Sequence, residues 1–113
     1  MKYEKLYAYL PYFQNVKRID EELEEKINQF VLMFSNEYLI EKYDEIIGDF
    51  CYDEEGWFNV SGCRECLDEM EEIDLIAIIS SLIIEDRYLK DLLKSEIKSG
   101  FLANVILQVQ KLD

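Results

Sequence analysis

The chain has 113 residues, half of them apolar, and its 12 basic and 25 acidic residues give a formal net charge of −13. This length predicts one domain spanning residues 1–113, and the apolar half excludes a disordered acidic tail. The negative charge excludes general binding to nucleic acid, and the lack of His removes the commonest general base and metal ligand.

The first part of the chain predicts helices separated by a few breakers. Apolar residues recur at helical spacing over residues 3–10, and Pro11 ends or turns this helix. Asp20 is a suitable N-cap for the next helix, whose apolar stripe is followed by a stop and restart at Ser35-Asn36. The restarted helix is expected to end with Gly48 as its C′ residue.

The middle of the chain predicts a loop over residues 49–66, followed by a buried helix. Asp68 and Glu71 have the spacing of a capping box for a helix over about residues 69–87. This helix is apolar nearly all round, which is typical of a central, buried element. The five Ile in its ten-residue apolar run also fit a strand, but the run is long for a strand and no partner strand is evident. We therefore favour a helix.

Two more helices complete the predicted fold. The first begins near Tyr88 and ends at Ser99-Gly100. The second covers residues 101–112, where an apolar stripe predicts either docking on the core or a seam for a partner helix. The sum is an all-α, compact bundle of about six helices, with the helix near residues 69–87 buried at its centre.

The sequence predicts a cytoplasmic protein that does not cross a membrane. Its longest apolar run has ten residues, whereas a span needs about 20, and its N-terminus lacks the apolar region of a signal peptide. The odd number of cysteines favours reduced thiols. Cys63 and Cys66 form a CxxC pattern with Cys51 nearby, but a zinc site needs a fourth ligand such as Asp53 or Glu65. We expect no metal and no cofactor.

Three local patterns resemble the bacterial family catalogued as domain of unknown function 6508. They are Tyr9-Leu10-Pro11-Tyr12-Phe13, Tyr43-Asp44-Glu45-Ile46-Ile47, and a C-terminal set of Asp86-Arg87-Tyr88, a leucine pair and Ser99-Gly100. The C-terminal likeness runs without gaps from about residue 82 to 112. The chain departs from the family pattern at Asp91, where a Gly is usual, and at Val105, where a Trp is usual. The resemblance implies an all-helical bacterial protein and no particular activity.

Arg87 is the cation that the sequence singles out. It follows acidic residues at the end of the apolar helix and lies between Asp86 and Tyr88. A planar guanidinium can bind an anion, or it can form a structural ion pair that locks the helix to a neighbour. The sequence allows both an anion-binding role and a structural role for Arg87, and we favour the structural ion pair.

Carboxylate pairs at helical spacing raise the alternative of an enzyme. Such a pair lies on one helix face and can share a divalent ion, as in all-helical, Mg-dependent nucleotide pyrophosphohydrolases. The chain has 25 acids, so pairs of this kind also arise by chance, and few cations accompany them to bind phosphate. The pairs are Glu21 with Glu24, Glu22 with Glu25, Glu41 with Asp44, and Glu71 with Asp74.

Charge is unevenly distributed along the chain. Residues 20–86 hold 21 acids and three bases, a net charge of −18, whereas residues 1–19 carry +3 and residues 87–113 carry +2. This layout fits a solvated surface, or an acidic face that steers a basic protein partner. It also suggests that the basic termini partly cover the acidic middle.

We expect a non-enzymatic interaction protein of the inhibitor, immunity or nucleic-acid-mimic type, and a homo-oligomer through residues 101–112 is a further alternative. Trp57 and Tyr43 are candidate aromatic anchors for a partner. The other expected contact residues are Glu21, Glu24, Glu41, Asp44, Asp53, Glu54 and Glu71.

Overall fold

The computed structural model describes residues 2–51, 54–55 and 59–113, and in this part of the chain it is all-α without a strand. Two of the expected contact residues, Asp53 and Trp57, lie outside the described residues. No helix in the described part is both long enough and apolar enough to cross a membrane.

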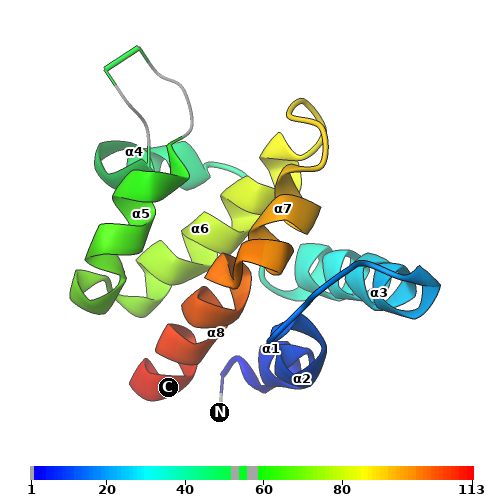
Figure 1. Cartoon of the computed structure of the whole chain (residues 1–113). Helices are drawn as coiled ribbons and strands as arrows, with labels where there is room; N and C mark the ends of the chain where they lie inside the picture. Colours follow the sequence, from blue (N-terminus) through cyan, green and yellow to red (C-terminus); the bar gives the residue numbers. More distant parts are fainter. Residues whose placement is uncertain (1, 52–53, 56–58) are drawn as a thin grey trace.

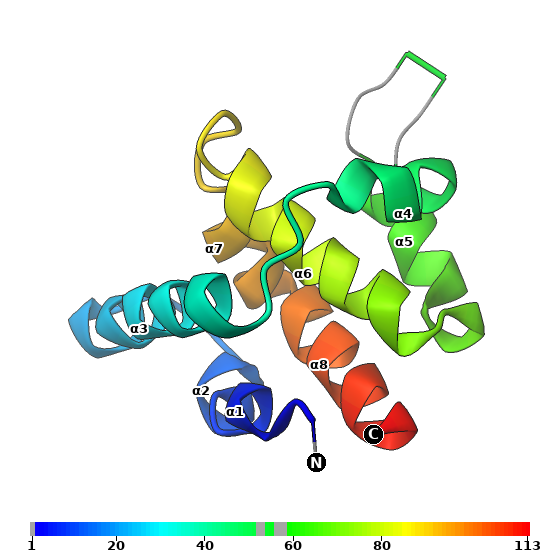
Figure 2. The same ribbon diagram turned by 180° about the vertical axis from the view of Figure 1, so that it is seen from behind.

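Helix α6 (Glu72–Glu85) crosses the middle of the molecule. In both views α4 (Tyr43–Cys51) and α5 (Val60–Cys66) lie on one side of it, and α3 (Glu21–Glu37) lies on the other (Figure 1, Figure 2). Every residue from 75 to 83 is buried, so the prediction of a central buried helix is confirmed. Its two serines satisfy their hydroxyls by donating to backbone carbonyls one turn earlier.

The start of α6 differs from the predicted capping box. Asp68 lies in a short 3₁₀ turn, η1 (Leu67–Glu69), which ends before the helix begins. The cap is formed one turn later, where the carboxylate of Asp74 accepts a hydrogen bond from the backbone N–H of Glu71 at 3.0 Å. Glu71 thus belongs to the capping box as its first residue rather than its last.

Helix α3 begins at the predicted residue, but it ends after the predicted stop at Ser35-Asn36. The carboxylate of Asp20 accepts a hydrogen bond from the N–H of Leu23 at 2.9 Å, which caps the helix. The helix then continues through Ser35-Asn36 to Glu37. Tertiary packing explains this extension, because the ring of Tyr38, which follows the helix, meets the ring of Tyr3 edge to face at 5.3 Å.

The N-terminal segment folds as two single turns rather than one helix. These are α1 (Glu4–Tyr7) and α2 (Leu10–Phe13), and Pro11 lies in the first turn of α2, where a missing N–H costs nothing. The rings of Phe13 and Phe30 meet edge to face at 5.2 Å, so these turns cover one side of α3.

Two other predicted boundaries were wrong. Gly48 lies inside α4 and does not end it, since the helix continues to Cys51. The predicted loop over residues 49–66 contains α5, a helix of seven residues. Packing of α4 against α5 and α6 stabilises this region, because a helix as short as α5 is not stable alone.

The C-terminal helices α7 (Leu92–Ser99) and α8 (Phe101–Leu112) meet at Gly100, whose φ of +87° allows the sharp turn. The predicted helix start at Tyr88 is wrong, because the residues before Leu92 form turns. Helix α8 docks on the core through six buried side chains, namely Phe101, Leu102, Ala103, Val105, Ile106 and Val109. Of the two alternatives predicted for this apolar stripe, docking on the core is therefore confirmed, and the stripe is covered by this chain's own helices.

Candidate functional site

The expected acidic contact residues do not form one continuous face. Glu21 and Glu24 lie at the start of α3, whereas Glu41 and Asp44 lie at the start of α4. Because α3 and α4 are on opposite sides of α6 in both views, the two groups point to different parts of the surface (Figure 1, Figure 2). The expected contact residues therefore form two separate groups.

The larger group lies on α4, α5, η1 and the segments next to them, and we call it the acidic end. All of its carboxylates are exposed, and the only exposed cations among its described residues are Lys42 and Arg64. The ion pairs formed by Lys5, Arg64 and Lys94 all involve acids outside this group. The acidic end comprises Glu41, Asp44, Glu45, Glu54, Glu55, Glu65, Asp68, Glu69 and Glu71.

The acids of α3 are in part engaged by the basic flanks of the chain. Lys94 of α7 contacts Glu24 at 2.9 Å, and this hydrogen bond raises the pKa of the lysine. Lys5 of α1 contacts Glu37 at 2.6 Å at the other end of the helix. The basic termini thus cover part of the acidic middle, as expected, but they do so on α3 and not at the acidic end.

Tyr43 is not a surface anchor. Its side chain is buried, and its hydroxyl is hydrogen-bonded to the carboxylate of Glu85 at the end of α6. The tyrosine therefore joins α4 to α6. The sequence could not distinguish this role, because an aromatic residue at the start of an acidic helix suits an anchor and a core contact equally well.

The triplet Asp86-Arg87-Tyr88 divides into one structural residue and two exposed ones. The carboxylate of Asp86 accepts a hydrogen bond from the N–H of Leu93 at 3.0 Å and so caps the first turn of α7. Arg87 is exposed and makes no ion pair with another described residue. Tyr88 is 79% exposed. The favoured structural ion pair at Arg87 is therefore absent from the described part of the chain.

Arg64 takes the structural role that the sequence suggested for Arg87. Its Nη2 lies 3.3 Å from both carboxylate oxygens of Glu96 in α7 and 3.0 Å from the hydroxyl of Ser99. Glu96 is buried, and this burial raises the pKa of its carboxyl, an effect that the guanidinium opposes. One signal was available, because Arg64 is the only base between Lys42 and Arg87.

The cysteines do not behave as three reduced thiols. Cys63 is buried and disulfide-bonded, whereas Cys66 is a free, half-buried thiol. A disulfide sulfur cannot act as a zinc thiolate, so the CxxC pattern does not supply both of its sulfurs to a metal. Cytosolic thiols are normally kept reduced. This bond removes the argument for a cytoplasmic location, which stays a prediction.

Two of the predicted carboxylate pairs have a member that is already engaged within the chain. Glu24 is bound to Lys94, and Asp74 caps the start of α6. Within the described residues, no group of three or more Cys, Asp or Glu side chains is placed to hold a metal ion.

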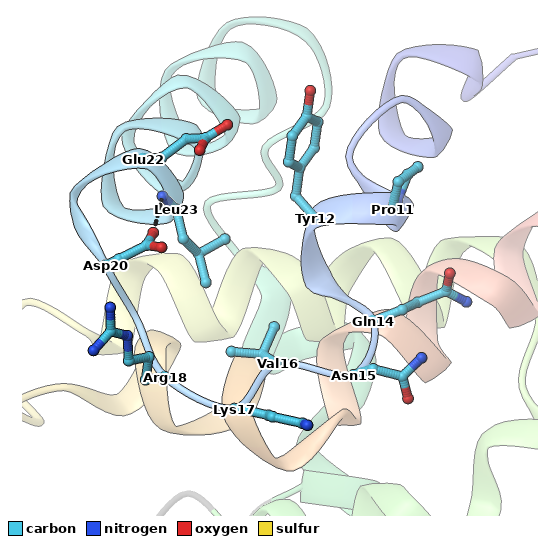
Figure 3. Close-up of a pocket in the computed structure, with 10 residues that line it drawn as sticks. All are labelled: Pro11, Tyr12, Gln14, Asn15, Val16, Lys17, Arg18, Asp20, Glu22 and Leu23. Atoms are coloured by element: carbon cyan, nitrogen blue, oxygen red, sulfur yellow. Dashed lines mark hydrogen bonds between the residues drawn. The ribbon is translucent and has the colours of Figure 1, made fainter.

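A surface cavity of about 410 Å³ lies between α2 and the start of α3 (Figure 3). Val16 and Leu23 form its floor, and the ring of Tyr12 forms one wall. The carboxylate of Asp20 is directed to the N–H of Leu23, which it caps. The guanidinium of Arg18 lies at the rim (Figure 3). Charges of both signs surround this cavity, so it does not select an anion or a cation.

Comparisons with family models, curated protein sequences and solved structures give no match for this chain. The resemblance to the bacterial family catalogued as domain of unknown function 6508 therefore rests on the sequence patterns alone and stays a prediction.

Proposed function

We propose that this chain is a non-enzymatic interaction protein that binds a basic protein partner through its acidic end. The observation that carries the proposal is the charge of that surface: its described residues include nine exposed carboxylates and two exposed cations, Lys42 and Arg64. A surface of one sign attracts a partner of the opposite sign and increases the rate of association at low salt.

The distribution of the ion pairs also supports this choice. The acids of α3 are reached by Lys5 and Lys94, which lower the local negative charge. The turn before α4 holds Glu41 and Lys42, and the first turn of α4 holds Asp44 and Glu45, so Lys42 is the one cation in this stretch. The acidic end therefore keeps more of its charge for a partner than α3 does.

The proposal is tested by affinity capture from a bacterial lysate at low and high salt, followed by purification of the captured protein. Two variants with equal charge changes are then compared. One neutralises the acidic end with Glu41→Gln, Asp44→Asn and Glu45→Gln. The control neutralises α3 with Glu21→Gln, Glu22→Gln and Glu25→Gln.

We expect the α4 variant to slow association by about tenfold and to weaken its salt dependence, because steering by charge acts mainly on the association rate. The α3 variant should associate nearly as fast as the unmodified chain. Partners that bind independently of salt, or equal effects of the two variants, would contradict the proposal.

A further inference from the structure

We propose that a cavity between α5, η1 and α8 binds a small ligand through a carboxylate or phosphate group of that ligand. The cavity has a volume of about 370 Å³. Small-molecule sites typically have volumes of roughly 300–1,000 Å³. This site adjoins the acidic end to which we assign partner binding and shares Arg64 and Asp68 with it, but its ligand-binding groups are N–H donors rather than carboxylates.

Three of these donors come from one face of α8. Asn104, Gln108 and Lys111 are spaced i, i+4 and i+7, so their side chains are directed to the same side of the helix and line the cavity. None of the three side chains is hydrogen-bonded to another residue in the described part of the chain. Two amides and an ammonium group are thus available to a ligand oxygen.

Arg64, on α5, also lines the cavity and supplies further donors. Its Nη2 is engaged by Glu96 and Ser99, and its guanidinium carbon lies 5.3 Å from the centre of the Phe101 ring. Its Nη1 and Nε make no hydrogen bond to any described residue. The side chain is 47% exposed, so these donors are accessible.

The burial of Glu96 gives Arg64 a fixed position. A buried carboxylate is costly unless it is paired, and here it holds one edge of a half-exposed guanidinium. Because Glu96 already fixes the Nη2 edge of the guanidinium, Arg64 loses little side-chain freedom when its other edge binds a ligand. Preorganisation of this kind is what anion recognition by arginine requires.

The other lining residues narrow the class of ligand. Leu67 and Leu107 offer apolar contact, and Asp68 is the one carboxylate among the described lining residues. A ligand with several negative groups would be repelled by Asp68. The cavity therefore suits a small organic molecule with a single oxyanion group, an apolar part and a hydrogen-bond donor for Asp68.

Nuclear magnetic resonance of the full, ¹⁵N-labelled chain tests this inference. Sodium phosphate and sodium acetate are added in separate titrations, with sodium chloride keeping the ionic strength constant. The side-chain amides of Asn104 and Gln108 and the Nε–H of Arg64 report on the cavity, and the Nε–H of Arg87 is the reference. We expect saturable shifts at the first three signals with at least one anion, which identifies the preferred group.

Matched lysine variants complete the test. Lys111→Gln should weaken binding by about tenfold, because it removes a charge-assisted hydrogen bond at an exposed position. Lys98→Gln removes the same charge from an exposed site on α7 and should leave binding unchanged. The inference is overturned if neither anion gives saturable shifts, if Arg87 shifts equally, or if the two variants behave alike. Partner binding at the acidic end is tested separately, through the variants at Glu41, Asp44 and Glu45.

Discussion

The guanidinium of Arg64 links three helices, α5, α7 and α8. It is carried by α5, it hydrogen-bonds to Glu96 and Ser99 of α7, and it lies over the ring of Phe101 in α8. Glu96 would be an unpaired buried carboxylate without it. The pairing of these two charges therefore contributes to the stability of this corner of the molecule.

We expect Arg64→Gln to lower the free energy of unfolding by about 2 kcal/mol at pH 7, because it leaves the buried carboxylate of Glu96 without its partner. This figure is below that of a fully buried pair, since Arg64 is half exposed. Denaturation by urea measures the change. The variant Lys98→Gln, which removes a solvated charge, should change stability little.

The loss of unfolding free energy in Arg64→Gln should be smaller at low pH than at neutral pH. Burial already raises the pKa of Glu96 above its usual value of 4.5, and removing Arg64 raises it further. The folded chain then takes up a proton above the pH at which the unfolded chain does, so stability falls as pH rises through this window. Arg64→Gln should cost less near pH 5 than at pH 7. The double variant with Glu96→Gln should show no such difference, and a difference that persists in it would contradict this assignment.

At the scale of the helices, two glycines with different surroundings show what sets the boundaries. Gly100 has a φ of +87° and joins α7 to α8, whereas Gly48 lies within α4. A Cβ added at either glycine meets no atom within 4 Å. Only the backbone conformation therefore distinguishes the two positions.

We expect replacement by Ala to have opposite effects at these glycines. Gly100→Ala should lower the free energy of unfolding by about 1 kcal/mol, because an L-residue is strained in the left-handed region. Gly48→Ala should raise it by about 0.5–1 kcal/mol, because Ala loses less backbone entropy in a helix. Thermal unfolding of the two variants side by side measures both changes. A stabilising Gly100→Ala would show that the turn does not need a glycine.

Local signals predicted some helix ends and not others. The cap at Asp20 and the turn at Gly100 were predicted correctly, because each depends on a residue type that satisfies the backbone locally. The helix α5 and the passage of α4 through Gly48 were missed. These two features depend on packing between α4, α5 and α6, which no local pattern encodes.

For the whole molecule, the charge layout is a balance between repulsion and a few cross-chain contacts. The net charge of −13 produces self-repulsion that opposes the compact state. Lys5 and Lys94 relieve part of it by contacting α3 from the two ends of the chain. Among the described residues, no ion pair joins the flanks to a carboxylate of the acidic end.

We expect sodium chloride to stabilise the fold. Raising the ionic strength from about 0.01 M to 0.1 M shortens the Debye length from about 30 Å to about 10 Å and screens repulsion across the molecule. Exposed ion pairs such as Lys5 with Glu37 contribute little to stability, so screening them removes little stabilisation by comparison. The midpoint of urea unfolding should therefore rise with salt. A midpoint that falls would mean that the ion pairs outweigh the repulsion.

The sequence by itself determined the helical class, the burial of residues 75–83 and the positions where a cap or a glycine ends a helix. These follow from periodicity and from hydrogen bonds within one turn, which are local. Only the tertiary structure decided that the acids form two groups on opposite sides of α6 and that Tyr43 is buried. It also decided that Arg64, rather than Arg87, meets a carboxylate. Residues 64 and 96 are 32 positions apart, and such contacts depend on how whole helices pack against one another.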